Sequence, residues 1–402
     1  MRLPGERRMS RIELPPPASG CHLLVELHNR DHLAAAYGET FARAALAALQ
    51  WRMHLAGHSI KQAGDRRFVA WIAEAGSFAE HWQLQLAGLP LEHLGQRALP
   101  VVTVGEVRLS STSGPYPPQE LERLGGRAPI LEPVQCGWIW RERYEKDMAL
   151  ALAFHEALRS GEVGLSFQPI MRRNAGDRRD ASLYQEALLR LDQPGIGASG
   201  LVAAMERLGL VRLLDRVVLD AVIERLEREP TLHAGCNLSS HSLVDDAWWH
   251  GPLGRLQEQP TVAARLTLEI TETAPLGDFE SAKTFVGRLR ALGCQIAIDD
   301  FGEGHTRLDF VRQILPQVVK ISGTLLAEAM RSITGAREFS HLVALGGSIA
   351  PYVVAEGVER ASDTAVALAG GVNCLQGLAI ARPAGAWPPS RVCLPPVCRS
   401  AA

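Results

Sequence analysis

The alternation of short apolar runs with helical patterns between residues 164 and 380 constrains the fold of this 402-residue chain more than any other feature. Each cycle of strand and helix takes roughly 25 to 45 residues, and eight strands are expected. Eight strands with intervening helices match a (β/α)8 barrel of the TIM type, an α/β fold, in count and size. The predicted strands cover residues 165–170, 183–191, 235–238, 266–272, 295–300, 318–322, 352–357 and 374–380.

Polar or charged side chains accompany seven successive apolar runs. In a (β/α)8 barrel the chemistry gathers at the C-terminal ends of the strands, so we expect these side chains to meet at one face. A buried carboxylate is costly unless it is paired or bound to a cation. Hard oxygen donors without thiolate or imidazole favour Mg²⁺ or Mn²⁺ over Zn²⁺. The residues are Glu186, Asn237, Glu269, Asp299, Asp300, Lys320, Glu356 and Gln376.

Two adjacent carboxylates, Asp299 and Asp300, stand where one apolar run ends and a glycine-containing loop begins. Neighbouring carboxylates repel, and neighbouring strand residues point to opposite faces. At the end of a strand this alternation relaxes, so both side chains can converge on one divalent cation or on a pair of them. A solvated Asp-Asp turn would explain this segment alone. The repetition of acidic strand ends along the chain favours a metal site.

Composition limits the remaining functional classes. Apolar residues make up 47% of the chain and charged residues 21%, as in an ordinary soluble globular protein. The net charge of −2 gives no reason to expect DNA as a partner. The seven cysteines form no Cys-x-x-Cys pair, and no stretch approaches the roughly 20 apolar residues of a membrane span. We therefore expect a cytoplasmic protein without a membrane span.

The region before the barrel divides into three parts. Residues 1–19 are rich in Arg and Pro and are expected to be a disordered lead-in. Residues 20–110 show a small α+β pattern, with strands at 22–27, 68–72 and 101–104 and helices at 38–56 and 77–87. Residues 111–143 have the composition of a linker. The barrel domain then covers residues 144–392 and begins with an amphipathic helix over 144–160.

Eight short motifs follow one another along the predicted barrel. No single motif is specific, because a second Glu-Ala-Leu at 156–158 is explained by helical phase alone. The set comprises Phe-Gln-Pro-Ile (167–170), Glu-Ala-Leu-Leu-Arg (186–190), Asn-Leu-Ser (237–239), Glu-Ile-Thr-Glu (269–272), Asp-Asp-Phe-Gly (299–302), Lys-Ile (320–321), Glu-Gly-Val-Glu (356–359) and Gln-Gly (376–377). With this order and spacing, residues 145–390 resemble an EAL domain, the family of cyclic di-GMP phosphodiesterases.

The resemblance implies metal-dependent hydrolysis of cyclic di-GMP to pGpG, with two Mg²⁺ or Mn²⁺ ions and catalysis by Glu186, Lys320 and Glu356. Lys320 would hold the attacking water or help to deprotonate it. One cation would be held by Glu186, Asn237, Glu269 and Asp299, and the second by Asp299, Asp300 and Glu356. The nucleotide site would be lined by Gln168, Leu188, Arg190 and Gln376. Glu272 would anchor the loop over 300–307, and a homodimer through the barrel is expected.

Three single residues and one loop depart from the family pattern. Ser322 stands where Asp commonly follows Lys-Ile, and the loop over 303–307 reads Glu-Gly-His-Thr-Arg where small or hydroxyl residues are commoner. Asn373 replaces a usual Asp, and Leu378 replaces an aromatic residue. None of these is an inferred metal ligand. A catalytically silent cyclic di-GMP receptor is the alternative function, whereas a purely structural barrel would leave the ring of carboxylates unexplained.

Residues 20–110 resemble a GGDEF domain, the family of diguanylate cyclases, in element order and in altered motifs. Gly-Asp-Arg-Arg-Phe (64–68) stands where the Gly-Gly-Asp-Glu-Phe signature would be, so Arg66 and Arg67 replace acidic residues. The upstream metal Asp corresponds at best to Glu26. A cyclase without its metal carboxylates cannot activate the attacking hydroxyl. We expect a degenerate, non-catalytic GGDEF-like domain that regulates the barrel, with an unrelated small α+β domain as the alternative.

Overall fold

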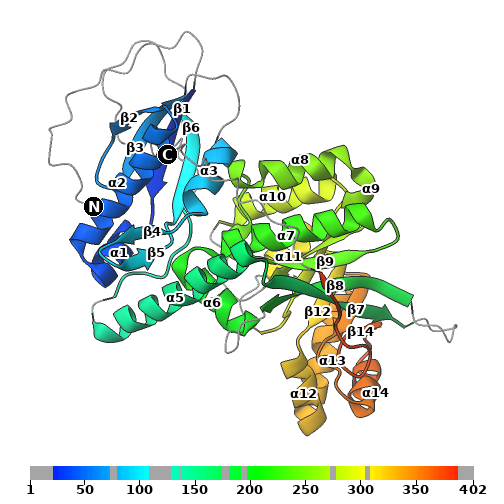
Figure 1. The fold of residues 1–402 in the computed structure, drawn as a ribbon. Helices are drawn as coiled ribbons and strands as arrows, with labels where there is room; N and C mark the ends of the chain where they lie inside the picture. Colours follow the sequence, from blue (N-terminus) through cyan, green and yellow to red (C-terminus); the bar gives the residue numbers. More distant parts are fainter. Residues whose placement is uncertain are drawn as a thin grey trace. The chain divides into compact units, whose positions relative to one another are not determined.

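The structure is a computed structural model that describes residues 21–72, 79–107, 128–135, 137–173, 181–191, 197–271, 278–303 and 308–387 (Figure 1). The chain divides into two compact units, which we describe separately. The first comprises Met1–Pro129, Val134–Glu142 and Pro395–Ala402, and the second comprises Ile130–Pro133 and Arg143–Leu394. The expected lead-in over 1–19 lies outside the described residues, as does most of the expected linker.

A four-stranded antiparallel sheet forms the centre of the first unit. The order of its strands is β2-β3-β1-β6. The apolar central strand β1 is buried along most of its length, which accounts for its place between two neighbours. The elements are β1 (Cys21–Leu27), α1 (Arg30–Tyr37), α2 (Glu39–Leu55), β2 (Ser59–Gln62), β3 (Arg67–Ile72), α3 (Ala79–Ala87), β4 (Leu91–His93), β5 (Gln96–Ala98) and β6 (Val102–Val107).

The strands and helices predicted for this unit are present, and four further elements were not predicted. Strand β2 has only one apolar residue and lies at the edge of the sheet, so it carries no clear strand pattern. Strands β4 and β5 form a hairpin of three-residue strands. Helix α1 is separated from α2 by Gly38, whose φ of 93° is readily adopted by glycine. These elements are too short or too polar for periodicity to reveal them.

Eight strands of the second unit close into a barrel. The strand order is β14-β13-β12-β11-β10-β9-β8-β7, and β14 pairs with β7 to complete the ring. A ninth strand, β15 (Ala384–Trp387), pairs with β7. The barrel strands are β7 (Val163–Arg172), β8 (Ala181–Leu191), β9 (Ala234–Ser239), β10 (Leu266–Thr271), β11 (Gln295–Asp299), β12 (Val318–Ile321), β13 (Tyr352–Ala355) and β14 (Cys374–Leu375).

The barrel departs from strict alternation at its first strand. Strand β7 runs antiparallel to both β8 and β14, whereas the pairs from β8 to β14 are parallel. Only residues 173–180 separate β7 from β8, and a parallel crossover needs about a dozen residues or more. The expectation of a helix in every cycle is therefore wrong at this position.

The eighth strand is shorter than the sequence predicted. β14 ends at Leu375, whereas the apolar pattern continues to residue 380. Gly377 has a φ of 154°, and a Cβ atom there would collide with the backbone of Val358. The chain therefore leaves the barrel wall where it passes closely over the segment that follows β13.

Helices lie outside the barrel strands (Figure 1). Helix α5 (Trp138–Ser160) begins before residue 144, so the end of the predicted linker is helical. Its apolar residues Met148, Ala151 and Phe154 are buried at helical spacing. The other helices are α6 (Ala198–Leu208), α7 (Val211–Arg228), α8 (His250–Glu258), α9 (Pro260–Ala263), α10 (Phe279–Ala291), α11 (Leu308–Ile314), α12 (Gly323–Arg331), α13 (Ile333–Gly347) and α14 (Ala361–Ala369), with 3-10 turns η1 (Ser240–Ser242) and η2 (Ala247–Trp249).

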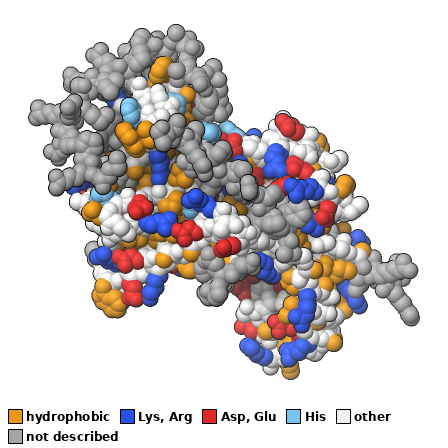
Figure 2. Space-filling model, in the orientation of Figure 1, with side chains coloured by type: hydrophobic (Ala, Val, Ile, Leu, Met, Phe, Trp, Pro, Cys, Tyr) orange, Lys and Arg blue, Asp and Glu red, His pale blue; other side chains and the backbone are white. Residues whose placement is uncertain are grey.

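Surface character agrees with the composition. Among the described residues, no helix has both the length and the apolar character that crossing a bilayer requires. On the described part of the barrel unit drawn in Figure 2, side chains of both charge signs are interspersed. That visible face carries no continuous basic surface of the kind that nucleic acid recruits.

Candidate active site

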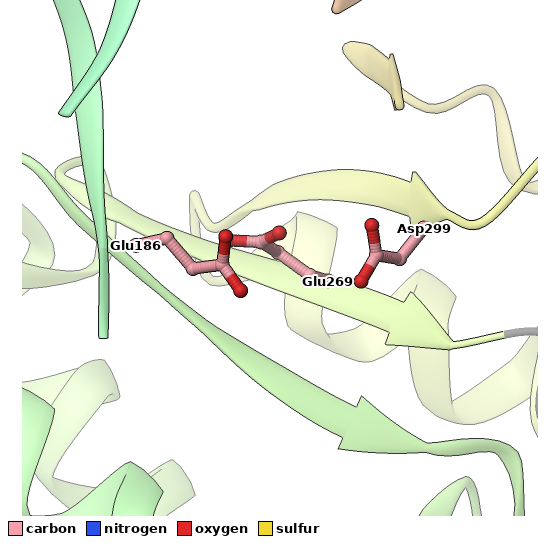
Figure 3. Close-up of side chains that lie close together, drawn as sticks. All are labelled: Glu186, Glu269 and Asp299. Atoms are coloured by element: carbon pink, nitrogen blue, oxygen red, sulfur yellow. The ribbon is translucent and has the colours of Figure 1, made fainter. Parts of the chain in front are cut away.

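Strand register brings the predicted acidic residues together. In the parallel pairs, Glu269 of β10 lies level with Asn237 of β9, and Asp299 of β11 lies level with Thr271. Figure 3 shows the carboxylates of Glu186, Glu269 and Asp299 projecting into one space from three strands. Oxygen atoms of these three residues lie within 4.8 Å of one another. The barrel thus brings carboxylates that are far apart in the sequence into one cluster.

Lys320 lies at the centre of this cluster and is completely buried. Its Nζ atom lies 2.5 Å from Glu269 and 3.0 Å from Asp299. It also lies 3.1 Å from Glu186 and 2.6 Å from Glu356. An ammonium group has three N–H donors and one positive charge, so it can neither donate to nor neutralise four ionised carboxylates. The cluster therefore needs either further positive charge or protonation of some of its carboxyl groups.

Amide side chains hold the carboxylate of Glu186 from two sides. Asn237 Nδ2 donates to Glu186 Oε1 at 2.8 Å, and Gln376 Nε2 donates to Glu186 Oε2 at 2.6 Å. Gln168 lies next to this group, 3.4 Å from Gln376 Nε2, and its own amide donates to the carbonyl of Ala381 at 3.0 Å. Residues from β7, β8, β9 and the end of β14 are thereby joined around one carboxylate.

A second acidic cluster shares Asp299 with the first. Oxygen atoms of Asp299, Asp300 and Glu356 lie within 4.8 Å of one another. Asp300 and Glu356 stand just beyond β11 and β13 and are partly exposed, whereas Glu269 is fully buried. The second cluster therefore lies nearer the mouth of the barrel than the first.

Burial and crowding alter the acid–base properties of the cluster. Burial raises the pKa of the Glu269 carboxyl well above its usual range, and the neighbouring Glu186 adds to this effect. Burial, followed by the charge of Asp299, does the same to the pKa of Glu356. Burial alone would lower the pKa of Lys320, but the surrounding carboxylates hold it well above its ordinary value. Lys320 is consequently an ammonium group at neutral pH.

The donor set fits divalent cations. Glu269 Oε1 and Asn237 Oδ1 are buried and accept no hydrogen bond from the described residues. Buried oxygens in this state are costly unless a donor or a cation satisfies them. The ligands are carboxylate and carboxamide oxygens, which suit Mg²⁺ or Mn²⁺. Two acidic clusters that share one aspartate match the shared-ligand arrangement of a two-cation site.

The residues predicted to line the nucleotide site are spread more widely than the acidic residues around Lys320. Glu186, Leu188 and Arg190 share one face of β8, because strand residues two apart point the same way. Exposure rises from the buried Glu186 to the exposed Arg190, which places Arg190 outermost. The guanidinium group of Arg190 donates a hydrogen bond to the carbonyl of Leu189 at 3.0 Å. Glu272, the predicted loop anchor, lies outside the described residues.

Two residues support the cluster without having been predicted. Tyr184 is buried on β8, on the same face as Glu186. A Cβ atom at Gly235 would lie 2.6 Å from both the Tyr184 ring and Glu269 Oε1, so only glycine leaves room for both side chains. The sequence could have indicated Tyr184, because it lies two residues before Glu186 on the same strand and therefore points to the same face. The contact at Gly235 joins three strands and has no local sequence signal.

The described departures have different surroundings. Asn373 accepts a hydrogen bond from the backbone N–H of Val353 at 2.8 Å and donates to the carbonyl of Pro351, so it fixes the start of β13. Leu378 is half exposed. Ser322 and Glu303 contact each other.

Comparison with known proteins decides the family. The sequence pattern of the EAL domain matches residues 151–383, more than half of the chain. This chain belongs to the EAL domain family.

Relatives of this EAL domain chain include named phosphodiesterases. It is 26% identical over 258 residues to the cyclic di-GMP phosphodiesterase NbdA of Pseudomonas aeruginosa, covering 60% of this chain and 31% of NbdA. The solved structure named PaMucR phosphodiesterase, c-di-GMP complex, is 27% identical, with a TM-score of 0.52 over 58% of this chain and 97% of that one. Vibrio cholerae LapD S helix-GGDEF-EAL shares the fold over 89% of this chain and 88% of its own, at 16% identity and a TM-score of 0.51.

Proposed function

We propose that this protein hydrolyses cyclic di-GMP to pGpG with two divalent cations bound in the barrel mouth. The observation that carries the proposal is the ring of carboxylates around Lys320, in which one ammonium faces four acidic groups. The names of NbdA and PaMucR support a phosphodiesterase, and PaMucR was solved as a c-di-GMP complex. The chain spans about a third of the length of NbdA, so the activity of the whole protein is inferred for the EAL unit.

The cluster assigns a role to each residue. Glu186, Asn237, Glu269 and Asp299 would hold one cation, and Asp299, Asp300 and Glu356 the other. Bound cations would supply charge stabilisation for the phosphodiester and activation of a water nucleophile. Lys320 would hold the attacking water or help to deprotonate it. Arg190, at the outer end of β8, would meet a phosphate with its planar guanidinium group, beside Leu188.

We also propose that the first unit is a GGDEF-like domain without cyclase activity. The turn between β2 and β3 carries Asp65 and Arg66, where the sequence resemblance places the signature motif. Arg66 lies 3.1 Å from Asp31, and Arg67 lies 3.7 Å from Glu26. Guanidinium groups thus occupy the positions near carboxylates where a cyclase would need cations. The fold shared with LapD over most of the chain supports a GGDEF-like unit.

Purified full-length protein incubated with cyclic di-GMP tests the phosphodiesterase. We expect pGpG as the product with Mg²⁺ or Mn²⁺, and no product in excess chelator. Ca²⁺ should inhibit, because its larger radius and looser geometry misplace the water. Tight binding of cyclic di-GMP without turnover in any of these metals would instead support the silent receptor.

Incubation of the Asp299→Ala variant with GTP tests the first unit separately, since this variant should not destroy any cyclic di-GMP that forms. We expect no cyclic di-GMP. Its accumulation would overturn the assignment of a non-catalytic unit.

A further inference from the structure

The two acidic clusters differ in how their members are held. Glu186, Glu269 and Asp299 lie within strands, where ladder hydrogen bonds fix the backbone. Asp300 belongs only to the second cluster and lies in the turn that follows β11. Its position therefore depends on what holds this turn.

The turn at Asp300 has an unusual backbone conformation. Asp300 has a φ of 51°, in the left-handed region that residues other than glycine rarely adopt. The next residue, Phe301, donates its backbone N–H to the carbonyl of Lys320 on β12 at 2.9 Å. Gly302 follows with a φ of 102°, and a Cβ atom there would lie 2.9 Å from Leu342. The turn is therefore held against neighbouring elements, and Asp300 has little freedom to relax.

A side-chain contact holds the far end of the same turn. The hydroxyl of Ser322 donates a hydrogen bond to the carboxylate of Glu303. Ser322 is 3% exposed and follows β12 directly, two residues after Lys320. The backbone N–H of Glu303 also lies 3.2 Å from the carbonyl of Asp300. Asp300 thus lies between the end of β11 and two attachments to the end of β12, one through Phe301 and one through Glu303.

Glu303 and Ser322 are also two of the departures noted in the sequence. The family pattern has an acid after Lys-Ile and small or hydroxyl residues in the loop, whereas this chain has Ser322 after Lys-Ile and Glu303 in the loop. The two departures contact each other in the fold, and Ser322 supplies the hydroxyl donor while Glu303 supplies the carboxylate acceptor.

We propose that Glu303 and Ser322 are a positioning pair that holds Asp300 for the second cation. Neither residue belongs to the acidic clusters around Lys320, so they act through the backbone of the turn. The inference rests on the proposed two-cation function. It predicts that breaking the pair weakens the second cation site and spares the first, whose other members stand on strands.

Mn²⁺ binding to the full-length protein without nucleotide tests the pair, with free Mn²⁺ measured by electron paramagnetic resonance. The variants are Ser322→Asp, which opposes two carboxylates, Glu303→Thr, and the double variant E303T/S322D, which restores a hydroxyl–carboxylate pair with the roles exchanged. We expect Ser322→Asp to weaken the second site about tenfold or more, the range for residues behind metal ligands. The first site should be unchanged, and the double variant should return to within about threefold of the parent.

Glu258→Thr provides the matched control, because Glu258 is an exposed glutamate on α8, outside the acidic clusters. It should bind two Mn²⁺ ions like the parent. Unchanged binding in Ser322→Asp, equal weakening of both sites, or additive losses in the double variant would overturn the pair. A parental chain that binds fewer than two Mn²⁺ ions would also overturn it. A parent that binds two ions, shows the expected variant pattern and hydrolyses no cyclic di-GMP would refute only the proposed activity.

Discussion

At the scale of single residues, the site is governed by charge balance. Lys320 is completely buried and is surrounded by four carboxylates. Burial raises the pKa values of Glu269 and Glu356, and the surrounding carboxylates raise that of Lys320. Removing an acid and removing the base should therefore have opposite effects on stability.

Glu186→Ala and Asp299→Ala each remove an anionic ligand from the crowded cluster. We expect turnover to fall at least about 100-fold, since even residues behind metal ligands cost 10- to 100-fold. Thermal unfolding should show a retained fold. Glu156→Ala is the control, because Glu156 begins the second Glu-Ala-Leu tripeptide on the exposed side of α5. Near-parental activity in either cluster variant would contradict the metal assignment.

Lys320→Met keeps the volume of the buried stem and removes the positive charge. Loss of one partner from a buried charge cluster typically costs about 3–5 kcal/mol, so we expect a lower melting temperature in chelator. Added Mn²⁺ should raise the melting temperature of this variant more than that of the parent, since cations become the remaining counter-charge. Differential scanning fluorimetry with and without Mn²⁺ measures both effects. Equal melting temperatures of Lys320→Met and the parent in chelator would show that Lys320 does not stabilise the cluster by its charge.

At the scale of elements, helix α7 is tied to the end of β9, which carries Asn237. Asp215 accepts hydrogen bonds from the backbone N–H of Ser239 at 3.0 Å and from the hydroxyl of Ser242 at 2.5 Å. Burial raises the pKa of Asp215 to about 7, with a further rise from Glu206. The ordinary pKa is lower, so the folded protein binds this proton more tightly than the unfolded chain does. The stability contributed by this site therefore falls as pH rises from about 4 to about 7.

Asp215→Asn keeps an acceptor oxygen and removes the buried charge. We expect the variant to lose this decline, so its stability relative to the parent should be greater at pH 8 than at pH 5. About 3 kcal/mol of this effect falls between pH 5 and pH 8 if the two hydrogen bonds persist, because the pKa of about 7 lies two units above pH 5. Urea unfolding at both pH values measures it. If the stability difference between variant and parent were the same at pH 5 and pH 8, Asp215 would not be the titrating group.

At the scale of the whole molecule, α5 belongs to both units and leads directly into β7, which carries Gln168. Residues 130–133, before this helix, pack on the barrel unit. Leu131 lies against Gly209, and the backbone of Glu132 bonds to Arg207. Regulation by the first unit, and a homodimer through the barrel, remain predictions that this connection makes testable.

A chain that begins at Ala128 removes the first unit's sheet and keeps residues 130–133 on the barrel. We expect it to bind cyclic di-GMP and to differ several-fold in turnover from the full-length protein, because small shifts of reacting groups cost large factors in rate. The rates should be compared across a range of protein and GTP concentrations. Equal turnover throughout would make the first unit a passive tether.

The sequence alone predicted the elements and residues that have a local signal. The apolar runs and the polar residues that accompany them predicted a barrel of eight strands, and they indicated the residues that surround Lys320. Local periodicity is sufficient there, because each strand carries its own pattern and parallel pairing aligns the strand ends. The same reasoning found α2 and β1 and missed the polar edge strand β2.

Tertiary structure decided what depends on residues far apart in the chain. The reversal of β7 follows from a connection too short for a crossover, and the early end of β14 follows from contact with Val358. Glu303 and Ser322 looked like two separate departures until the fold brought them together. A contact between strand ends is set by the packing of whole elements, and this packing leaves no periodic trace near either residue.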